Sequence, residues 1–119
     1  MITQIPKELL KGSLKSIVLK LLSENGKMYG YEITQMVENL SEGKIKLTYG
    51  ALYPILHKLE NDGSVKTETE IVNNRTRVYY ELTKTGFNTA KEKVNELEEF
   101  INTIKILIYP NPALELCRS

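Results

Sequence analysis

Four stretches of the chain carry apolar residues at three- and four-residue spacing, which is the period of a helix that buries one face. They span residues 13–25, 31–40, 48–63 and 84–109. Between the third and fourth stretches the period changes to two, which predicts β-strands. The pattern therefore predicts three helices, a β-hairpin and a long final helix, a mainly helical α+β fold.

The third stretch, TYGALYPILHKLENDG from Thr48 to Gly63, predicts a helix with two unlike faces. Thr48 suits the N-cap because its side chain can accept a hydrogen bond from a free backbone N–H. Gly63 can end the helix in a left-handed conformation. The apolar stripe of this helix consists of Leu52, Ile55, Leu56 and Leu59. We expect that stripe to face the core.

The opposite face of the same helix carries no carboxylate. Its residues are Gly50, Tyr53, Pro54, His57, Lys58 and Asn61. Pro54 lies beyond the first turn, where it removes a backbone hydrogen bond and costs up to about 3 kcal/mol. Two interpretations stay open from this stretch alone. The helix is a core element with a tolerated kink, or this face binds a partner.

Residues 65–82 predict a β-hairpin whose loop is Asn73-Asn74, because Asn tolerates the positive φ of a tight hairpin turn. With this loop, the numbers of facing residues add up to 147. The facing pairs include Val65 with Leu82, Thr67 with Tyr80, Thr69 with Val78, Lys66 with Glu81, and Glu70 with Arg77. Apolar groups then share one side and two opposite-charge pairs the other, as cross-strand pairing favours.

The second helix is entered by a turn at residues 28–31 and left through residues 41–43. Its apolar stripe is expected to contain Ile33, Met36, Val37 and Leu40. Residues 44–47 then alternate like a very short strand that leads into Thr48. A helix, a short link and a second helix follow the order of a helix-turn-helix, with a link longer than in its tightest versions.

The final helix carries a heptad seam that predicts dimerisation. Phe87, Ala90, Val94, Leu97, Ile101, Ile104 and Ile108 follow one another at alternating spacings of three and four. A helix over residues 84–109 would reach about 39 Å at about 1.5 Å per residue, so its end must project from a small domain. A second copy of the chain is the simplest partner for a projecting seam; the alternative is a helix that folds back on its own domain.

Composition argues against enzyme chemistry. The 119 residues carry a net charge of +1, so any nucleic-acid binding must come from a local cluster of charge. His57, Asp62 and Cys117 are single representatives of their types, too few for a metal site or a catalytic triad. The longest apolar runs are too short to span a membrane and the N-terminus has no signal core, so we expect a cytoplasmic protein without cofactors.

Three stretches of the chain are candidate family motifs: MYGYEI at residues 28–33, LTYGALYPILHKLENDG at 47–63, and VYYELTKTG at 78–86. In these motifs the chain resembles the PadR family of bacterial transcriptional regulators. The likeness covers roughly residues 12–108, and the Tyr-Pro pair in the middle motif is its most specific feature. The single C-terminal helix is similar to the smaller branch of that family.

This resemblance implies a homodimeric winged helix-turn-helix protein that binds a double-stranded DNA operator. The third helix would enter the major groove, and the wing would lie along the backbone or minor groove. The residues then expected to contact DNA are Thr48, Gly50, Tyr53, Pro54, His57, Lys58, Asn74, Arg75 and Arg77. The structural alternative for Arg77 is an ion pair with Glu70.

The resemblance also suggests a repressor that a small hydrophobic or phenolic ligand relieves. The chain has no Trp, so the stacking of drugs between tryptophans seen in some small members is doubtful here, whereas a pore lined by the first and last helices remains open. The dimer seam would use Val94, Leu97, Ile101, Ile104 and Ile108.

The expected organisation is a DNA-binding domain at residues 1–83, a dimerisation helix at 84–109 and a tail at 110–119. The main alternative function is a winged-helix module that binds protein and not DNA, which the near-neutral charge favours. The carboxylate-free helix face and the basic hairpin tip speak against that alternative.

Overall fold

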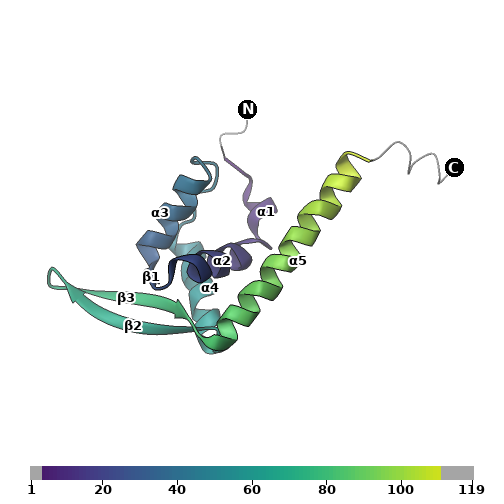
Figure 1. The fold of residues 1–119 in the computed structure, drawn as a ribbon. Helices are drawn as coiled ribbons and strands as arrows, with labels where there is room; N and C mark the ends of the chain where they lie inside the picture. Colours follow the sequence, from purple (N-terminus) through teal and green to yellow (C-terminus); the bar gives the residue numbers. More distant parts are fainter. Residues whose placement is uncertain (1–3, 111–119) are drawn as a thin grey trace.

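The computed structural model describes residues 4–110, so most of the predicted tail, with Cys117, lies outside the described residues. The predicted winged helix-turn-helix with a long C-terminal helix is confirmed (Figure 1). In chain order the elements are α1 (Lys7–Leu10), α2 (Leu14–Asn25), β1 (Met28–Tyr29), α3 (Gly30–Leu40), α4 (Tyr49–Asn61), β2 (Val65–Val72), β3 (Arg75–Leu82) and α5 (Lys84–Ile108).

The core lies where α2, α3 and α4 meet the base of the sheet. The largest side chains with no or almost no exposed surface are Val18, Leu19, Leu22, Ile33, Leu52, Leu56 and Leu59. The stripe predicted for the third helix is therefore confirmed, with Ile55 partly buried at its edge. The inclusion of Leu40 in the second stripe is wrong: it is 72% exposed because it is the last residue of α3 and lies beyond the packed helices.

The hairpin forms in the predicted register. Val65 faces Leu82 at its base and Val72 faces Arg75 at its tip. Asn73 and Asn74 have φ values of 50° and 62°, the left-handed conformation that a tight hairpin turn requires. Strand β3 is central in the sheet, with the order β1-β3-β2.

Two details of the sheet differ from the prediction. Residues 28 and 29, predicted as part of a turn, form strand β1, in which Met28 pairs with Tyr80 and Tyr29 with Tyr79. A strand of two residues is too short to produce a sequence period. Residues 44–47, predicted as a short strand, form a bend and an irregular link and no strand within the described chain. Burial of Leu47 and a hydrogen bond from the Ile45 N–H to the Ser41 hydroxyl hold this link instead.

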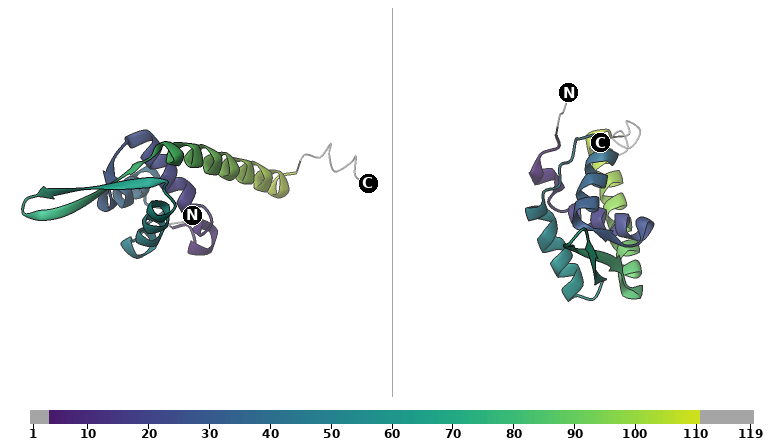
Figure 2. Two further views of the ribbon diagram at one scale, coloured as in Figure 1. Left: turned by 90° about the horizontal axis from the view of Figure 1, so that it is seen from below. Right: turned by 90° about the vertical axis from the view of Figure 1, so that its left-hand side faces the viewer.

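Helix α5 begins against the turn between α4 and β2. The Thr83 hydroxyl accepts a hydrogen bond from the Gly86 N–H and donates one to the Gly63 carbonyl at 2.6 Å. Gly86 approaches the backbone so closely that an added Cβ would lie 1.9 Å from the Ser64 carbonyl oxygen. The first half of α5 then packs against α2, and the helix continues away from the body, opposite to the hairpin (Figure 2).

The predicted seam of α5 is only partly covered in the single chain. Ala90 is buried, and Val94, Leu97 and Ile104 are half-buried. Toward the end of the helix Ile101 and Ile108 remain 46% and 61% exposed. In the part of the chain that the structure describes, none of the helices combines the length and apolar character needed to cross a membrane.

Candidate nucleic-acid interface

The outer face of α4 is a continuous exposed surface. Every residue predicted for it is exposed: Thr48, Gly50, Tyr53, Pro54, His57, Lys58 and Asn61. Leu52, Leu56 and Leu59 on the other side are fully buried, so the division of this helix into two faces is confirmed. Because Pro54 is exposed, packing in the core does not offset the cost of its missing N–H, which argues against the interpretation of α4 as only a core helix.

Aromatic rings line the outer face along one ridge of α4. Tyr49, Tyr53 and His57 follow at four-residue spacing, and their ring centroids lie 6.0 Å and 4.9 Å apart. At the start of the helix the Thr48 hydroxyl accepts a hydrogen bond from the Ala51 N–H at 3.2 Å. The Thr48 hydroxyl hydrogen is not used in this bond, so the hydroxyl can also donate. The face therefore offers donors and flat apolar surface without negative charge, a chemistry suited to phosphates and base edges.

The wing residues predicted to bind DNA fall into two groups. Asn74, in the turn, and Arg75, the first residue of β3, are exposed at the hairpin tip. Arg77 is half-buried lower on β3, where its guanidinium carbon lies 4.3 Å from the centroid of the Tyr29 ring. A hydrogen bond with Tyr79 raises the pKa of Arg77, so its positive charge is permanent.

One of the two predicted cross-strand ion pairs is confirmed. Lys66 Nζ lies 3.4 Å from Glu81 Oε1. The other predicted facing pair, Glu70 with Arg77, also forms in register, but the alternative that Glu70 engages Arg77 in an ion pair is not realised: the Glu70 carboxylate pairs with Lys27 at 3.3 Å. The Arg77 guanidinium instead stacks on the ring of Tyr29. Tyr29 directly precedes α3 and is far from Arg77 in the sequence.

Lys27 neutralises the negative charge of β2. Its Nζ lies 3.0 Å from Glu68 Oε2 as well as 3.3 Å from Glu70 Oε1, and 5.3 Å from the centroid of the Tyr79 ring. Hydrogen bonds to both carboxylates raise the pKa of Lys27. Sequence reasoning missed this cluster because its members come from separate elements.

Tyr29 and Tyr49 were also missed as members of the site, although both lie in the quoted motifs. Gly30 leaves room for Tyr49: an added Cβ at Gly30 would lie 2.6 Å from the Tyr49 hydroxyl oxygen. Two motifs far apart in the sequence therefore meet where α3 begins beside α4. Buried Tyr80 lies beneath them, and burial, followed by the influence of Tyr53, raises the pKa of Tyr80 to about 12.

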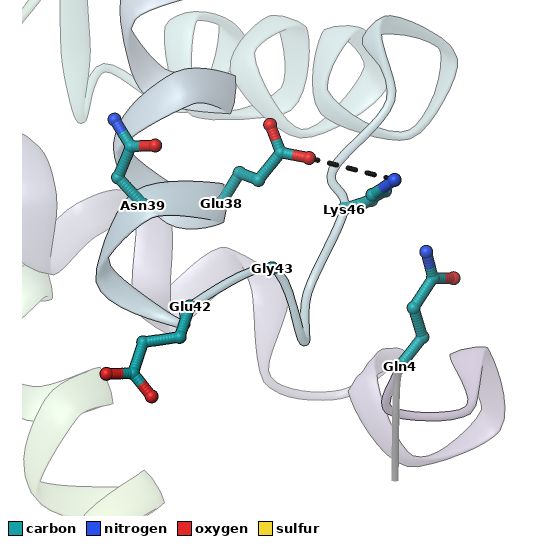
Figure 3. A pocket seen from close by; sticks show the side chains of 6 residues that line it. All are labelled: Gln4, Glu38, Asn39, Glu42, Gly43 and Lys46. Atoms are coloured by element: carbon teal, nitrogen blue, oxygen red, sulfur yellow. Dashed lines mark ion pairs between the residues drawn. The ribbon is translucent and has the colours of Figure 1, made fainter.

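Another cleft of the described chain has a different character. It has a volume of about 590 Å³ and lies at the C-terminal end of α3, where Glu38 reaches toward Lys46 across 3.9 Å (Figure 3). Gln4, Asn39, Glu42 and Gly43 complete its lining. Across residues 4–110 no three His, Cys, Asp or Glu side chains gather in a geometry that could hold a metal ion.

Known proteins share both the sequence and this arrangement. The model of the transcriptional regulator PadR-like family matches residues 18–92. A transcriptional regulator of Mycobacterium tuberculosis is 30% identical over 98 residues, which are 82% of this chain and 88% of that protein. The match to that regulator therefore covers more than four fifths of each protein.

Solved structures give the same result. A transcriptional regulator from Clostridium thermocellum is 27% identical, with a TM-score of 0.76 over 88% of this chain and 100% of that one. A PadR family regulator from Eggerthella lenta is also 27% identical, with a TM-score of 0.71 over 87% of this chain and 88% of that one. Fold, exposed helix face and family match agree on a winged-helix DNA-binding regulator and not an enzyme. This chain belongs to the PadR-like family of transcriptional regulators.

Proposed function

We propose that the protein is a homodimeric repressor that inserts the outer face of α4 into the major groove of its operator and lays the wing beside it. The observation that carries this proposal is the exposed, carboxylate-free face of α4. The core contacts of the helix come from its buried stripe, so packing of the core does not explain the composition of this face.

Individual residues of this face suit different parts of DNA. Thr48 and Tyr53 carry hydroxyls that can donate to phosphates, and Gly50 lets the duplex approach the helix. Pro54 offers a flat apolar surface with no N–H to satisfy. His57 and Lys58 lie farther along the helix, where side chains can reach base edges or phosphates.

At the wing, Asn74 and Arg75 are placed to reach the backbone or a narrow minor groove. Their exposure at the tip of a projecting hairpin supports this role, because the tip makes no contribution to the core. Arg77 would act closer to the recognition helix, from its position on Tyr29.

The proposed dimer forms through α5. Val94, Leu97 and Ile104 are half-buried, and Ile101 and Ile108 are more exposed. Burying apolar surface contributes about 25 cal/mol per Å². A second copy that covered this seam would remove its apolar surface from water, which would stabilise the dimer relative to two separate chains. The two recognition helices would then be joined in one molecule.

Relief of repression by a small apolar ligand is supported by the groove between α2 and α5. Its volume is about 360 Å³, and Phe87, Ala90 and Val94 contribute apolar surface to it. Lys20, Lys91 and Glu98 at the same groove would bring polar contacts. A ligand there would touch the dimerisation helix and the body together.

The proposal is tested by substitutions on the outer face. We expect Tyr53→Ala and Lys58→Ala each to weaken binding to the DNA upstream of the protein's own gene by about tenfold, since one contact to a base or phosphate contributes about 1–3 kcal/mol. Thermal stability should stay nearly unchanged. Lys91→Ala is the matched control, because it removes the same charge from an exposed position on α5, outside α4 and the wing.

Unfolding of Tyr53→Ala would show that this ring belongs to the core. Equal DNA binding by all four proteins would contradict the proposal and favour the winged-helix module that binds protein, to which the net charge of +1 is better suited.

A further inference from the structure

A cleft of about 260 Å³ lies between the N-terminal half of α4 and strand β3. Tyr49 and Tyr53 line it from α4, and Arg77 lines it from β3. Tyr29, the N-cap residue of α3, also belongs to its lining. The cleft therefore separates the helix proposed to enter the major groove from the wing proposed to lie beside it.

The chemistry of this cleft is that of an anion site. Among the described residues that line it there are phenol hydroxyls and one guanidinium but no carboxylate. Each of three other clefts of the protein includes at least one carboxylate: Glu38 and Glu42 in the first, Glu98 in the second, and Glu68 and Glu81 in the third. Positive and donor groups in a lining that contains no acid favour a bound phosphate.

The acid that influences the pKa of Arg77, Glu32, is occupied elsewhere. Glu32 accepts a hydrogen bond from the Tyr29 N–H at 3.1 Å, as part of the cap of α3. Its carboxylate is not part of the cleft lining. The Arg77 guanidinium is therefore positioned by the Tyr29 ring, 4.3 Å away, and not by an ion pair with a residue of the cleft lining.

The groups that line the cleft are held in place before any ligand arrives. The Tyr29 ring that supports Arg77 packs edge-on against Tyr79, with ring centroids 5.5 Å apart. The Tyr49 hydroxyl rests against Gly30, where any larger residue would displace it. Less side-chain freedom is then lost on binding, which raises affinity.

The course of a DNA strand leads to the same place. The sugar-phosphate backbone is what separates a major groove from the adjacent minor groove. If α4 occupies one groove and the wing lies along the next, that backbone must cross the cleft between them. We propose that this cleft binds a single backbone phosphate of the DNA, held by the Arg77 guanidinium and by the hydroxyls of Tyr49 and Tyr53. The proposal rests on the proposed function and adds a specific contact to it.

The test uses a duplex that the wild-type protein selects from a random-sequence pool. Each phosphate of one half-site is replaced in turn by an uncharged methylphosphonate, and affinities are measured for wild type, Arg77→Gln and Tyr49→Phe. At one phosphate position we expect the replacement to weaken wild type by about tenfold, as loss of a charge-assisted contact should. At that position Arg77→Gln should lose less than about twofold, because its contact is already absent.

Tyr49→Phe keeps the ring and removes only the hydroxyl, so the ring atoms that lie beside Gly30 remain. It should show reduced sensitivity at the same position as Arg77→Gln. Thermal melting of both variants checks that each one is folded.

If methylphosphonate replacement weakens binding by the same factor in wild type and in both variants at every position, the cleft proposal is wrong. DNA binding by α4 would not be affected by that result. Coupling at a position for Arg77→Gln but none for Tyr49→Phe would overturn the role of the hydroxyl. If the wild-type protein selects no duplex at all, both the cleft proposal and the proposed function are wrong.

Discussion

Gly50 is the residue whose presence folding explains least. It lies in the first turn of α4, where glycine costs about 0.5–1 kcal/mol relative to alanine. An added Cβ would meet nothing closer than the Thr48 hydroxyl oxygen at 4.0 Å. The position therefore has room for a methyl group in the free protein, and the missing side chain is useful only if something else approaches the helix.

We expect Gly50→Ala to raise the free energy of unfolding by about 0.5–1 kcal/mol and to weaken operator binding several-fold, because the new methyl group would hold the duplex away. Chemical denaturation and a binding titration measure the two effects. Gly12→Ala serves as the control at another position where an added Cβ meets nothing within 4 Å. Unchanged DNA binding by Gly50→Ala would show that this part of α4 does not touch DNA.

Tyr80 of β3 is a buried tyrosine whose phenol is influenced by Tyr53 of α4. Burial, and next the neighbouring Tyr53, raise its pKa to about 12, above the ordinary value of 10.0. The unfolded chain would ionise this phenol first as pH rises. Its contribution to stability is therefore complete below about pH 10 and is lost as pH rises toward 12.

A loss of about 2–3 kcal/mol over this window is expected from the two-unit difference. Urea unfolding of wild type and Tyr80→Phe at pH 9 and pH 11.5 isolates the contribution, because the other tyrosines and lysines titrate in both proteins. Parallel pH dependence in the two proteins would mean that Tyr80 ionises as easily in the folded state as in the unfolded one.

At the scale of single elements, the hairpin was predictable because two local signals agreed. Alternation placed Val65, Tyr80 and Leu82 on one side, and Asn73-Asn74 allowed a turn in only one register. Strand β1 has neither signal, since two residues show no period. The position of Arg77 on Tyr29 was not predictable either, because it depends on how α3 and the sheet pack together.

The same limit applies to the candidate site. The outer face of α4 could be identified within one helix, where residue type and helical spacing are sufficient. The contribution of Tyr29 and Tyr49 required the tertiary fold, which brings the start of α3 beside α4 and β3. Glu70 illustrates the reverse case: strand register suggested Arg77 as its partner, yet Lys27 reaches it from outside the hairpin.

The wing should contribute affinity without sequence preference. Replacing Arg75 and Arg77 together by Ala should reduce the slope of log affinity against log salt by about one to two, since each phosphate neutralised contributes roughly 0.9. Specific and random duplexes should weaken by similar factors, because backbone contacts position the protein and do not read sequence. Lys58→Ala should lose more on the selected duplex if Lys58 reads a base edge.

Fluorescence anisotropy titrations over a series of salt concentrations measure these slopes, with Lys91→Ala again as control. An unchanged slope in the double variant would place the wing away from DNA.

At the scale of the whole molecule, the α5 seam determines whether two recognition helices act together. Ile101 and Ile108 are exposed in the single chain, so replacing them should leave its folding largely intact. We expect Ile101→Glu/Ile108→Glu to sediment as a monomer at micromolar concentration, because a dimer would bury both carboxylates without a partner. Asn102→Glu, which adds charge at a neighbouring exposed position, should remain dimeric.

Sedimentation of wild type as a monomer at micromolar concentration would contradict the proposed dimer directly. A chain ending at Leu82 should also be monomeric and less stable, because it loses Ala90 and the contacts of α5 with α2.

The most direct test of the account is a hydroxyl-radical footprint of the wild-type protein on the DNA upstream of its own gene. A dimer that places two α4 helices in successive major grooves should protect two segments on one side of the duplex, about one helical turn apart. The Tyr53→Ala protein should lose this pattern while remaining folded. Absence of protection by the wild-type protein at low salt, or an identical footprint from Tyr53→Ala, would contradict the claim that the outer face of α4 recognises DNA.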